Sequence, residues 1–151
     1  MTQILTLCVV TRPGEILLGY KKRGFGAGRW NGFGGHVEAK ETITDAALRE
    51  LREESDLVGH ALDHRGVIEF EFDDDTDDLV VHIFSVDQFS GEPIETDEMR
   101  PMWFSTEQIP FSEMWADDQH WLPLFLAGKR FIGKFHFKDH DTIKHHRLKE
   151  V

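Results

Sequence analysis

Residues 35–57 read GHVEAKETITDAALRELREESDL, and this stretch decides the fold because it predicts a helix with an unusual distribution of acids. Thr42 followed by Asp45 resembles a capping box, which is typical of a helix N-terminus. Apolar residues then recur at helical spacing as far as about Ser55. The spacing therefore predicts a helix over residues 42–55.

Three glutamates of this helix, Glu50, Glu53 and Glu54, fall in the same sector as its apolar residues when successive residues are placed about 100° apart. Burying neighbouring carboxylates without compensation is costly or forces their protonation. A divalent cation removes both penalties, and oxygen ligands on a rigid helix favour Mg²⁺ or Mn²⁺ together with substrate phosphates. A solvated acidic helix end is the alternative that the spacing alone leaves open.

The preceding residues, 21–35, contain six glycines, four basic side chains, three aromatic side chains and no acid. The aromatic residues distinguish this stretch from a flexible linker and predict an ordered loop. Its exposed N–H groups and its cations favour an anion beside the predicted metal. The loop fits neither a Walker motif nor GxGxxG. We therefore expect the helix to bind the metal and the loop to approach the phosphates.

The whole chain has 151 residues, of which 40% are hydrophobic, and we expect a single domain over residues 1–151. The net charge of −11 disfavours a nucleic acid polymer as a partner. The lone cysteine, Cys8, cannot form an internal disulfide and indicates a reducing compartment. The apolar run at residues 4–10 fits neither a signal peptide nor a membrane span. We expect a cytoplasmic protein, with the nucleus and mitochondria as further compartments.

Alternating and continuous apolar runs predict the other elements. The first two strands are expected to pair antiparallel, and the acidic run at 73–78 to be a solvated hairpin tip. Pro123 indicates that the second helix begins late or is kinked. The expected strands are 4–11, 16–20, 67–72, 79–89, 102–105, 131–137 and 142–148, and the second helix is 117–127.

Gly35, Glu41 and the run RELREE at 49–54 resemble the Nudix box, G-x5-E-x7-REUxEExGU, in which U is apolar. Asp56 stands where the box has glycine, and since aspartate tolerates a left-handed helix end, we expect a small cost. Further segments resemble the Nudix hydrolases that act on oxidised purine nucleoside triphosphates. These are KKRGFGAGRWNGFGG at 21–35, TDEMRP at 96–101 and IPFSEMWADD at 109–118.

This resemblance implies an α/β fold, the Nudix α/β/α sandwich with a mixed central sheet. It implies a Mg²⁺-dependent enzyme, with Mn²⁺ as a substitute, that converts 8-oxo-dGTP and 2-hydroxy-dATP to monophosphate and pyrophosphate. Such an enzyme sanitises the nucleotide pool and limits DNA damage. We expect a monomer that binds a small nucleoside triphosphate and no membrane.

The resemblance also implies the site residues. The metal ligands would be Glu50, Glu53, Glu54, Glu98 and the backbone carbonyl of Gly34. Arg49 would orient the carboxylates, and Glu54 is the first choice for the group that takes a proton from water. The substrate-binding residues would be Thr6, Lys21, Phe25, Asn31, Phe33, Gly34, Gly35, His36, Phe70, Leu79, Trp115, Asp117 and Asp118.

Asp117 and Asp118 would titrate as a pair. By exchanging protonation states they would recognise different purines. From the residues alone, these acids could instead cap a helix, Trp115 and Trp121 could belong to the core, and Asn31 could stabilise a local turn. His36 and Leu79 replace a lysine and a methionine of family members. The histidines at 136, 140, 145 and 146 have no metal-ligand spacing and are expected on a solvated surface.

Two alternative functions stay open at this stage. The first is a Nudix hydrolase of other modified nucleotides, such as methylated purine or dinucleoside polyphosphate substrates. The second is a module that binds a nucleotide without turnover, although such a module has no need for the four residues Arg49, Glu50, Glu53 and Glu54 together.

Overall fold

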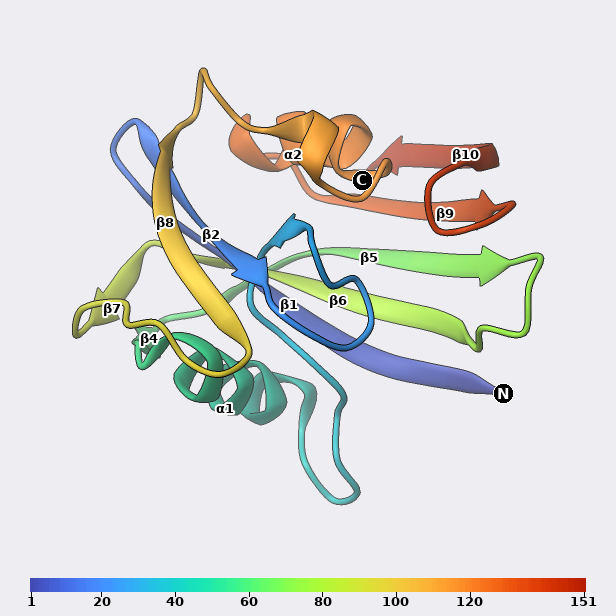
Figure 1. The fold of residues 1–151 in the computed structure, drawn as a ribbon. Coiled ribbons are helices and arrows are strands. Elements are labelled where there is room, and N and C mark those ends of the chain that lie inside the picture. The colour runs from blue at the N-terminus through green and yellow to red at the C-terminus, as the bar shows by residue number, and fades with distance from the viewer.

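A computed structural model describes residues 1–151 and shows a mixed sheet between two helices (Figure 1). The eight-stranded sheet has the order β10-β9-β5-β6-β1-β2-β3, and β8 pairs with the other edge of β2. Its strands are β1 (Thr2–Arg12), β2 (Glu15–Lys21), β3 (Trp30–Asn31), β5 (Asp63–Phe72), β6 (Asp78–Val86), β8 (Met99–Ser105), β9 (Phe131–Phe137) and β10 (Ile143–Glu150). A separate two-stranded sheet joins β4 (Val58–His60) to β7 (Gln88–Ser90).

The sheet is mixed because β1 runs parallel to β6 and β5 runs parallel to β9, whereas the other pairs are antiparallel. Helix α1 (Ile43–Ser55) lies on one face of the sheet and α2 (Asp118–Leu126) on the other (Figure 1). The predicted α/β/α sandwich and the antiparallel pairing of the first two strands are therefore confirmed.

The central strands are buried on both faces, which explains why β1 reads as a continuous apolar run. Successive side chains of a strand point to opposite faces, so Val9 packs in the α2 core while Cys8 and Val10 pack in the α1 core. Ile83 and Phe84 of β6 divide between the two cores in the same way.

Helix α1 has the ends that its sequence predicts. The backbone N–H of Asp45 donates a 3.0 Å hydrogen bond to Thr42 Oγ1, which caps the first turn. At the other end Asp56 adopts a left-handed conformation with φ 66°, and its N–H donates to the carbonyl of Arg52. Aspartate therefore takes the position that glycine has in the Nudix box, as expected.

Helix α2 contains Pro123 and begins at Asp118, one residue after the predicted start. A buried arginine, Arg65 on β5, donates hydrogen bonds to the carbonyls of Phe125 and Lys129 at the end of this helix. The Phe125 carbonyl also accepts from the N–H of Gly128, so Arg65 adds a bond there and connects the residues that follow α2 to β5. Neither helix of the protein is long and apolar enough to cross a membrane.

The structure corrects two strand predictions. The strand expected at 79–89 is two strands. Strand β6 ends at Val86 in the large sheet, and β7 pairs with β4 in the small sheet. The strand expected after Pro101 begins at Met99 instead, since β8 is an edge strand and Pro101 needs no ladder N–H on its free side. The short elements β3, β4 and the 3₁₀ turn Phe111–Glu113 were not predicted.

Candidate active site

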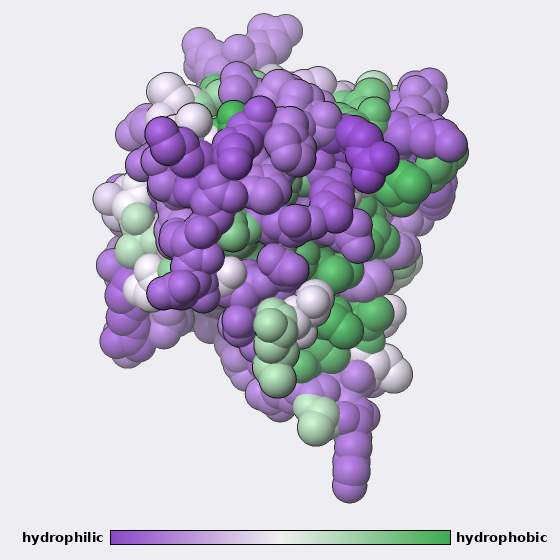
Figure 2. All heavy atoms as spheres, turned by 90° about the vertical axis from the view of Figure 1, so that its right-hand side faces the viewer, coloured by the Kyte–Doolittle hydropathy of each residue, from purple (hydrophilic) through white to green (hydrophobic).

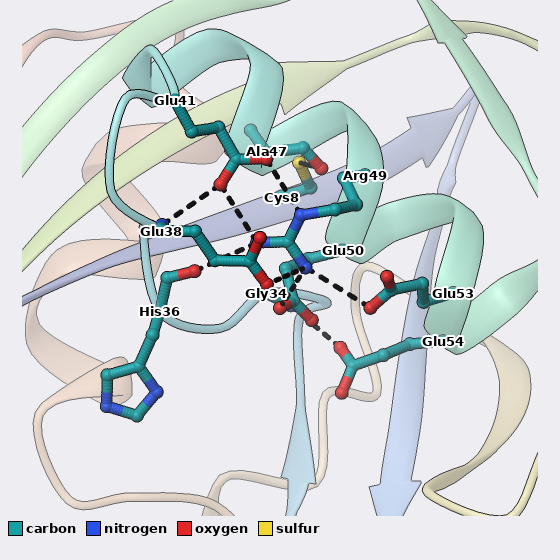
Figure 3. A network of polar contacts seen from close by, with 10 residues as sticks. All are labelled: Cys8, Gly34, His36, Glu38, Glu41, Ala47, Arg49, Glu50, Glu53 and Glu54. Atoms are coloured by element: carbon teal, nitrogen blue, oxygen red, sulfur yellow. Dashed lines mark hydrogen bonds and ion pairs between the residues drawn. The ribbon is translucent and has the colours of Figure 1, made fainter.

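Glu54 is the most buried carboxylate of α1, with an exposed fraction of 6%. The backbone N–H of Gly34 donates a 2.8 Å hydrogen bond to Glu54 Oε1 (Figure 3). Burial raises the pKa of Glu54 to about 7, and the Gly34 N–H and the nearby Lys21 act in the opposite direction. The group can therefore exchange a proton near neutral pH.

Arg49 connects an acid that precedes α1 with acids in the second half of this helix (Figure 3). Its guanidinium makes a bidentate pair with Glu41, at 2.7 Å to Oε2 and 3.0 Å to Oε1. It also donates to Glu50 Oε1 at 2.8 Å, to Glu53 Oε2 at 3.2 Å and to the carbonyl of His36 at 3.0 Å. A planar guanidinium can satisfy these acceptors together, whereas a lysine ammonium cannot reproduce the fork geometry.

Two glycines allow the loop to approach this cluster closely. A Cβ atom on Gly34 would lie 1.8 Å from the carbonyl oxygen of Thr6, and one on Gly35 would lie 2.6 Å from a carboxylate oxygen of Glu50. The first contact is with rigid backbone, and the second is with the end of a side chain. Glycine at these positions therefore lets the loop pack against both β1 and the acidic side of α1.

The carboxylates of α1 are oxygen donors beside the cavity that Glu54 lines, but no group of three or more His, Cys, Asp or Glu side chains in the structure is gathered closely enough to hold a metal ion. Glu50 and Glu54 are largely buried carboxylates, at 16% side-chain and 6% residue exposure, and repulsion between them raises the pKa of Glu54. Oxygen donors of this kind match the preference of Mg²⁺ and Mn²⁺. Glu53 is more exposed than the sequence predicts, with 58% of its side chain accessible. Glu98 lies in the loop before β8, where Arg23 donates two hydrogen bonds to its Oε1.

A cavity of about 140 Å³ begins at Glu54 and extends between the sheet and the N-terminus of α2. Eleven of its twenty lining residues are hydrophobic. Thr6 lines this cavity, and its buried hydroxyl has no hydrogen-bond partner in the protein. The predicted residues that line it are Thr6, Lys21, Phe25, Asn31, Gly34, Gly35, Glu54, Phe70, Leu79, Trp115, Asp117 and Asp118.

Asp117 and Asp118 are both buried at the cavity, at 3% and 7% exposure. The indole N–H of Trp121 donates a 2.8 Å hydrogen bond to Asp117 Oδ2. Burial raises the pKa of Asp117 to about 6, and burial together with the neighbouring Asp117 raises the pKa of Asp118 well above its usual value. The pair therefore retains a proton at a pH where an isolated aspartate is ionised.

The structure also tests the alternative structural roles of these residues, namely helix capping, core packing and a local turn. Asp117 is the residue that precedes α2, but its side chain makes no capping hydrogen bond. Trp121 belongs to the core, whereas Trp115 is half-buried and lines the cavity. The amide of Asn31 makes a local hydrogen bond to the carbonyl of Arg29 and still lines the cavity.

Two predicted substrate residues do not line the cavity. Phe33 is fully buried in the α1 core, whereas its neighbours Gly32 and Gly34 line the cavity. His36 is exposed, and its imidazole points away from the carboxylate cluster (Figure 3). The other lining residues were not predicted from the sequence, and they are Leu5, Leu7, Gly32, Phe72, Val81, Ile83, Met99 and Trp121. Alternation from Leu79 along β6 was the signal available for Val81 and Ile83.

This fold and this cluster of acids agree with comparisons to known proteins. A model of the NUDIX domain matches residues 1–125. The chain therefore belongs to the Nudix family, whose hydrolases generally use divalent metals. It is 57% identical over 150 residues to the oxidized purine nucleoside triphosphate hydrolase of Danio rerio, with 99% of this chain and 96% of that protein covered. The enzyme of the same name from Mus musculus is 53% identical over the same shares.

Solved structures share the fold. The mMutator MutT protein of Bacillus halodurans superposes with a TM-score of 0.88 at 24% identity, and the match covers 97% of each chain. The MutT NUDIX hydrolase of Burkholderia pseudomallei has a TM-score of 0.69 at 27% identity, with 73% of this chain and 88% of that chain covered.

Proposed function

We propose that this protein is a Mg²⁺-dependent hydrolase that converts oxidised purine nucleoside triphosphates, of the 8-oxo-dGTP and 2-hydroxy-dATP type, to monophosphate and pyrophosphate. One observation carries the proposal: a single cavity joins a buried pair of aspartates to a buried glutamate on the Nudix helix. The names of the 57% and 53% identical relatives support the same substrate class.

The acidic end of the cavity supports the chemistry. Glu50, Glu53 and Glu54 would hold the cation, which neutralises phosphate charge and activates water when it is bound. Lys21 lines the cavity near Glu54 and would pair with a phosphate oxygen. Glu54 lies at the cavity and is our first candidate for the group that would take the proton of the attacking water while pyrophosphate leaves.

The aspartate end of the cavity supports purine recognition. A neutral Asp118 can donate a hydrogen bond, whereas an ionised Asp117 can only accept. Asn31 has both a donor and an acceptor group, and the apolar side chains of Phe70 and Leu79 supply flat walls for a base. We also propose that the protein acts as a monomer, because one chain supplies both Glu54 and the aspartate pair of the cavity.

A panel of oxidised, methylated and unmodified nucleoside triphosphates tests this function by pyrophosphate release in the presence of Mg²⁺. We expect the oxidised purines to have the highest kcat/KM, and Glu54→Gln to lower kcat at least about 100-fold while the nucleotide still binds. The matched control is Glu107→Gln, which alters an exposed glutamate after β8. Binding of oxidised nucleotides without any hydrolysis would favour the module that binds without turnover.

A further inference from the structure

Three turns that are distant in the sequence meet at the aromatic side of the cavity. They are the glycine loop at residues 22–29, the β5–β6 turn at 73–77 and the β9–β10 turn at 138–142. Contacts between His140, Thr76 and Phe25 join all three. The face of the molecule that presents the ends of β5 and β9 is mainly hydrophilic, with hydrophobic side chains exposed between the polar ones (Figure 2).

The aromatic wall of the cavity is formed by Phe25 and Trp115, whose rings stack with centroids 5.1 Å apart. Phe25 is 44% exposed, and it lies between Gly24 and Gly26, which both have φ +81°. Glycines allow this backbone many conformations, so the position of the Phe25 ring depends on side-chain contacts.

His140 supplies such contacts without lining the cavity itself. Its ring centroid lies 5.1 Å from that of Phe25, 5.4 Å from that of Phe72 and 5.5 Å from that of Trp115, and all three of these residues line the cavity. Its Nε2 atom lies 3.1 Å from Thr76 Oγ1 and 3.4 Å from Asp74 Oδ2, which orient the ring from the β5–β6 turn.

Asp141, the next residue of the same turn, acts on the wall from a second direction. It accepts a 2.8 Å hydrogen bond from Arg29, whose guanidinium lies 4.2 Å from the ring centroid of Trp115. A cation held over an indole face is attracted to it, so the ion pair helps to fix Trp115. Asp139 accepts hydrogen bonds from the N–H groups of Asp141 and Thr142, which keep the turn in shape.

We propose that the β9–β10 turn is a positioning element for the purine: His140 and Asp141 hold the Phe25–Trp115 wall and thereby determine how well the cavity selects its base. This inference rests on the proposed function. The wall contacts the base and not the phosphates, so the turn affects KM and the preference between purines, while kcat depends on the glutamates of α1.

The experiment compares His140→Ala, His140→Phe and Asp141→Asn by kcat and KM for 8-oxo-dGTP and dGTP. The controls are His60→Ala, an exposed histidine of β4, and Asp63→Asn, which removes the ion pair with Arg130. We expect His140→Ala to raise KM for 8-oxo-dGTP about fivefold to tenfold, since each aromatic contact contributes modestly to the geometry. Asp141→Asn should raise it less, and kcat should stay within about twofold.

His140→Phe separates positioning from general stability, because it keeps the ring contacts and loses the hydrogen bond to Thr76. We expect this variant to regain most of the wild-type KM, whereas the two control variants should not change KM. An unchanged ratio of kcat/KM between 8-oxo-dGTP and dGTP in His140→Ala would overturn the inference, as would equal losses in His140→Ala and His140→Phe.

Quenching of tryptophan fluorescence by 8-oxo-dGMP in EDTA measures base binding without turnover. We expect a weaker affinity in His140→Ala and a nearly normal affinity in His140→Phe. If the wild-type protein binds 8-oxo-dGMP but both variants bind it equally well, the positioning role is wrong and the proposed function stands. If the wild-type protein neither binds nor hydrolyses oxidised purines, the proposed function itself fails.

Discussion

The backbone N–H of Gly34 donates a 2.8 Å hydrogen bond to Oε1 of Glu54, and this contact joins the glycine loop to the helix. The carboxylate of Glu54 is buried at the cavity, and the hydrogen bond fixes it beside the end of the glycine loop. The pKa of about 7 that burial produces makes this group responsive to both protons and cations. The aspartate pair lines the same cavity, so one cavity contains three buried acids.

Removal of the metal should stop the reaction without unfolding the protein. We expect EDTA to abolish pyrophosphate release and Mg²⁺ or Mn²⁺ to restore it. Because a cation relieves the repulsion among the carboxylates, Mg²⁺ should raise the Tm of the wild-type protein. The rise should be smaller in Glu50→Gln and unchanged in Glu107→Gln. Equal rises in all three proteins, measured by calorimetry, would place the cation elsewhere.

Arg49→Lys should lower kcat by about 100-fold, because a lysine cannot maintain the bidentate pair with Glu41 and the bonds to Glu50 and Glu53. Arg52→Lys is the matched control on the same helix, since Arg52 makes an exposed pair with Asp56. Its kcat should be close to that of the wild-type protein. Steady-state pyrophosphate release measures both variants, and comparable losses in the two would contradict the assigned role of Arg49.

Asp117→Asn and Asp118→Asn should change the relative use of 8-oxo-dGTP and 2-hydroxy-dATP. An amide cannot exchange between the donating and accepting states of a carboxyl group, so each variant should favour one base. We expect the ratio of the two kcat/KM values to shift by about tenfold in at least one variant. Parallel competition assays with both substrates measure this ratio. Equal losses of kcat/KM for both substrates would argue against base recognition through the protonation state of the pair.

The aspartate pair should also make the stability of the metal-free protein depend on pH. The pKa of Asp117 rises from 3.8 to about 6 on folding, so its stabilising contribution is present below pH 3.8 and is lost as the pH rises through 6. The pKa of Asp118 shifts in the same direction. The free energy of unfolding should therefore fall between pH 4 and pH 7.

Asp118→Asn should reduce this dependence and stabilise the protein at pH 8 relative to the wild type, since no buried carboxylate then has to ionise at that position. Urea unfolding at pH 4 and pH 8 measures the difference. Asp63→Asn, at a more exposed position, should follow the wild-type curve. A wild-type stability that increases steadily from pH 4 to pH 8 would show that the pair is ionised in the folded protein.

Local chemistry controls where α1 begins and ends, on which side of the helix its acids lie, and where most of the strands form. These features were therefore predictable from the sequence. Thr42 caps the helix and Asp56 ends it, as the sequence indicates. The strand at 79–89 was predicted wrongly because β6 and β7 pair in different sheets, and pairing is not a property of the local sequence. Phe33 was assigned to the substrate on family resemblance, yet it packs in the core.

The sequence by itself determined that three glutamates share a helical side with apolar residues, since helical periodicity is local and regular. It also identified the glycine loop and the adjacent aspartates. Only the tertiary structure decided that Glu54 is buried while Glu53 stays largely exposed, and that His140 and Asp141 reach the aromatic wall. Burial and contacts between distant residues depend on how the whole sheet pairs, and therefore no short stretch of the chain contains that information.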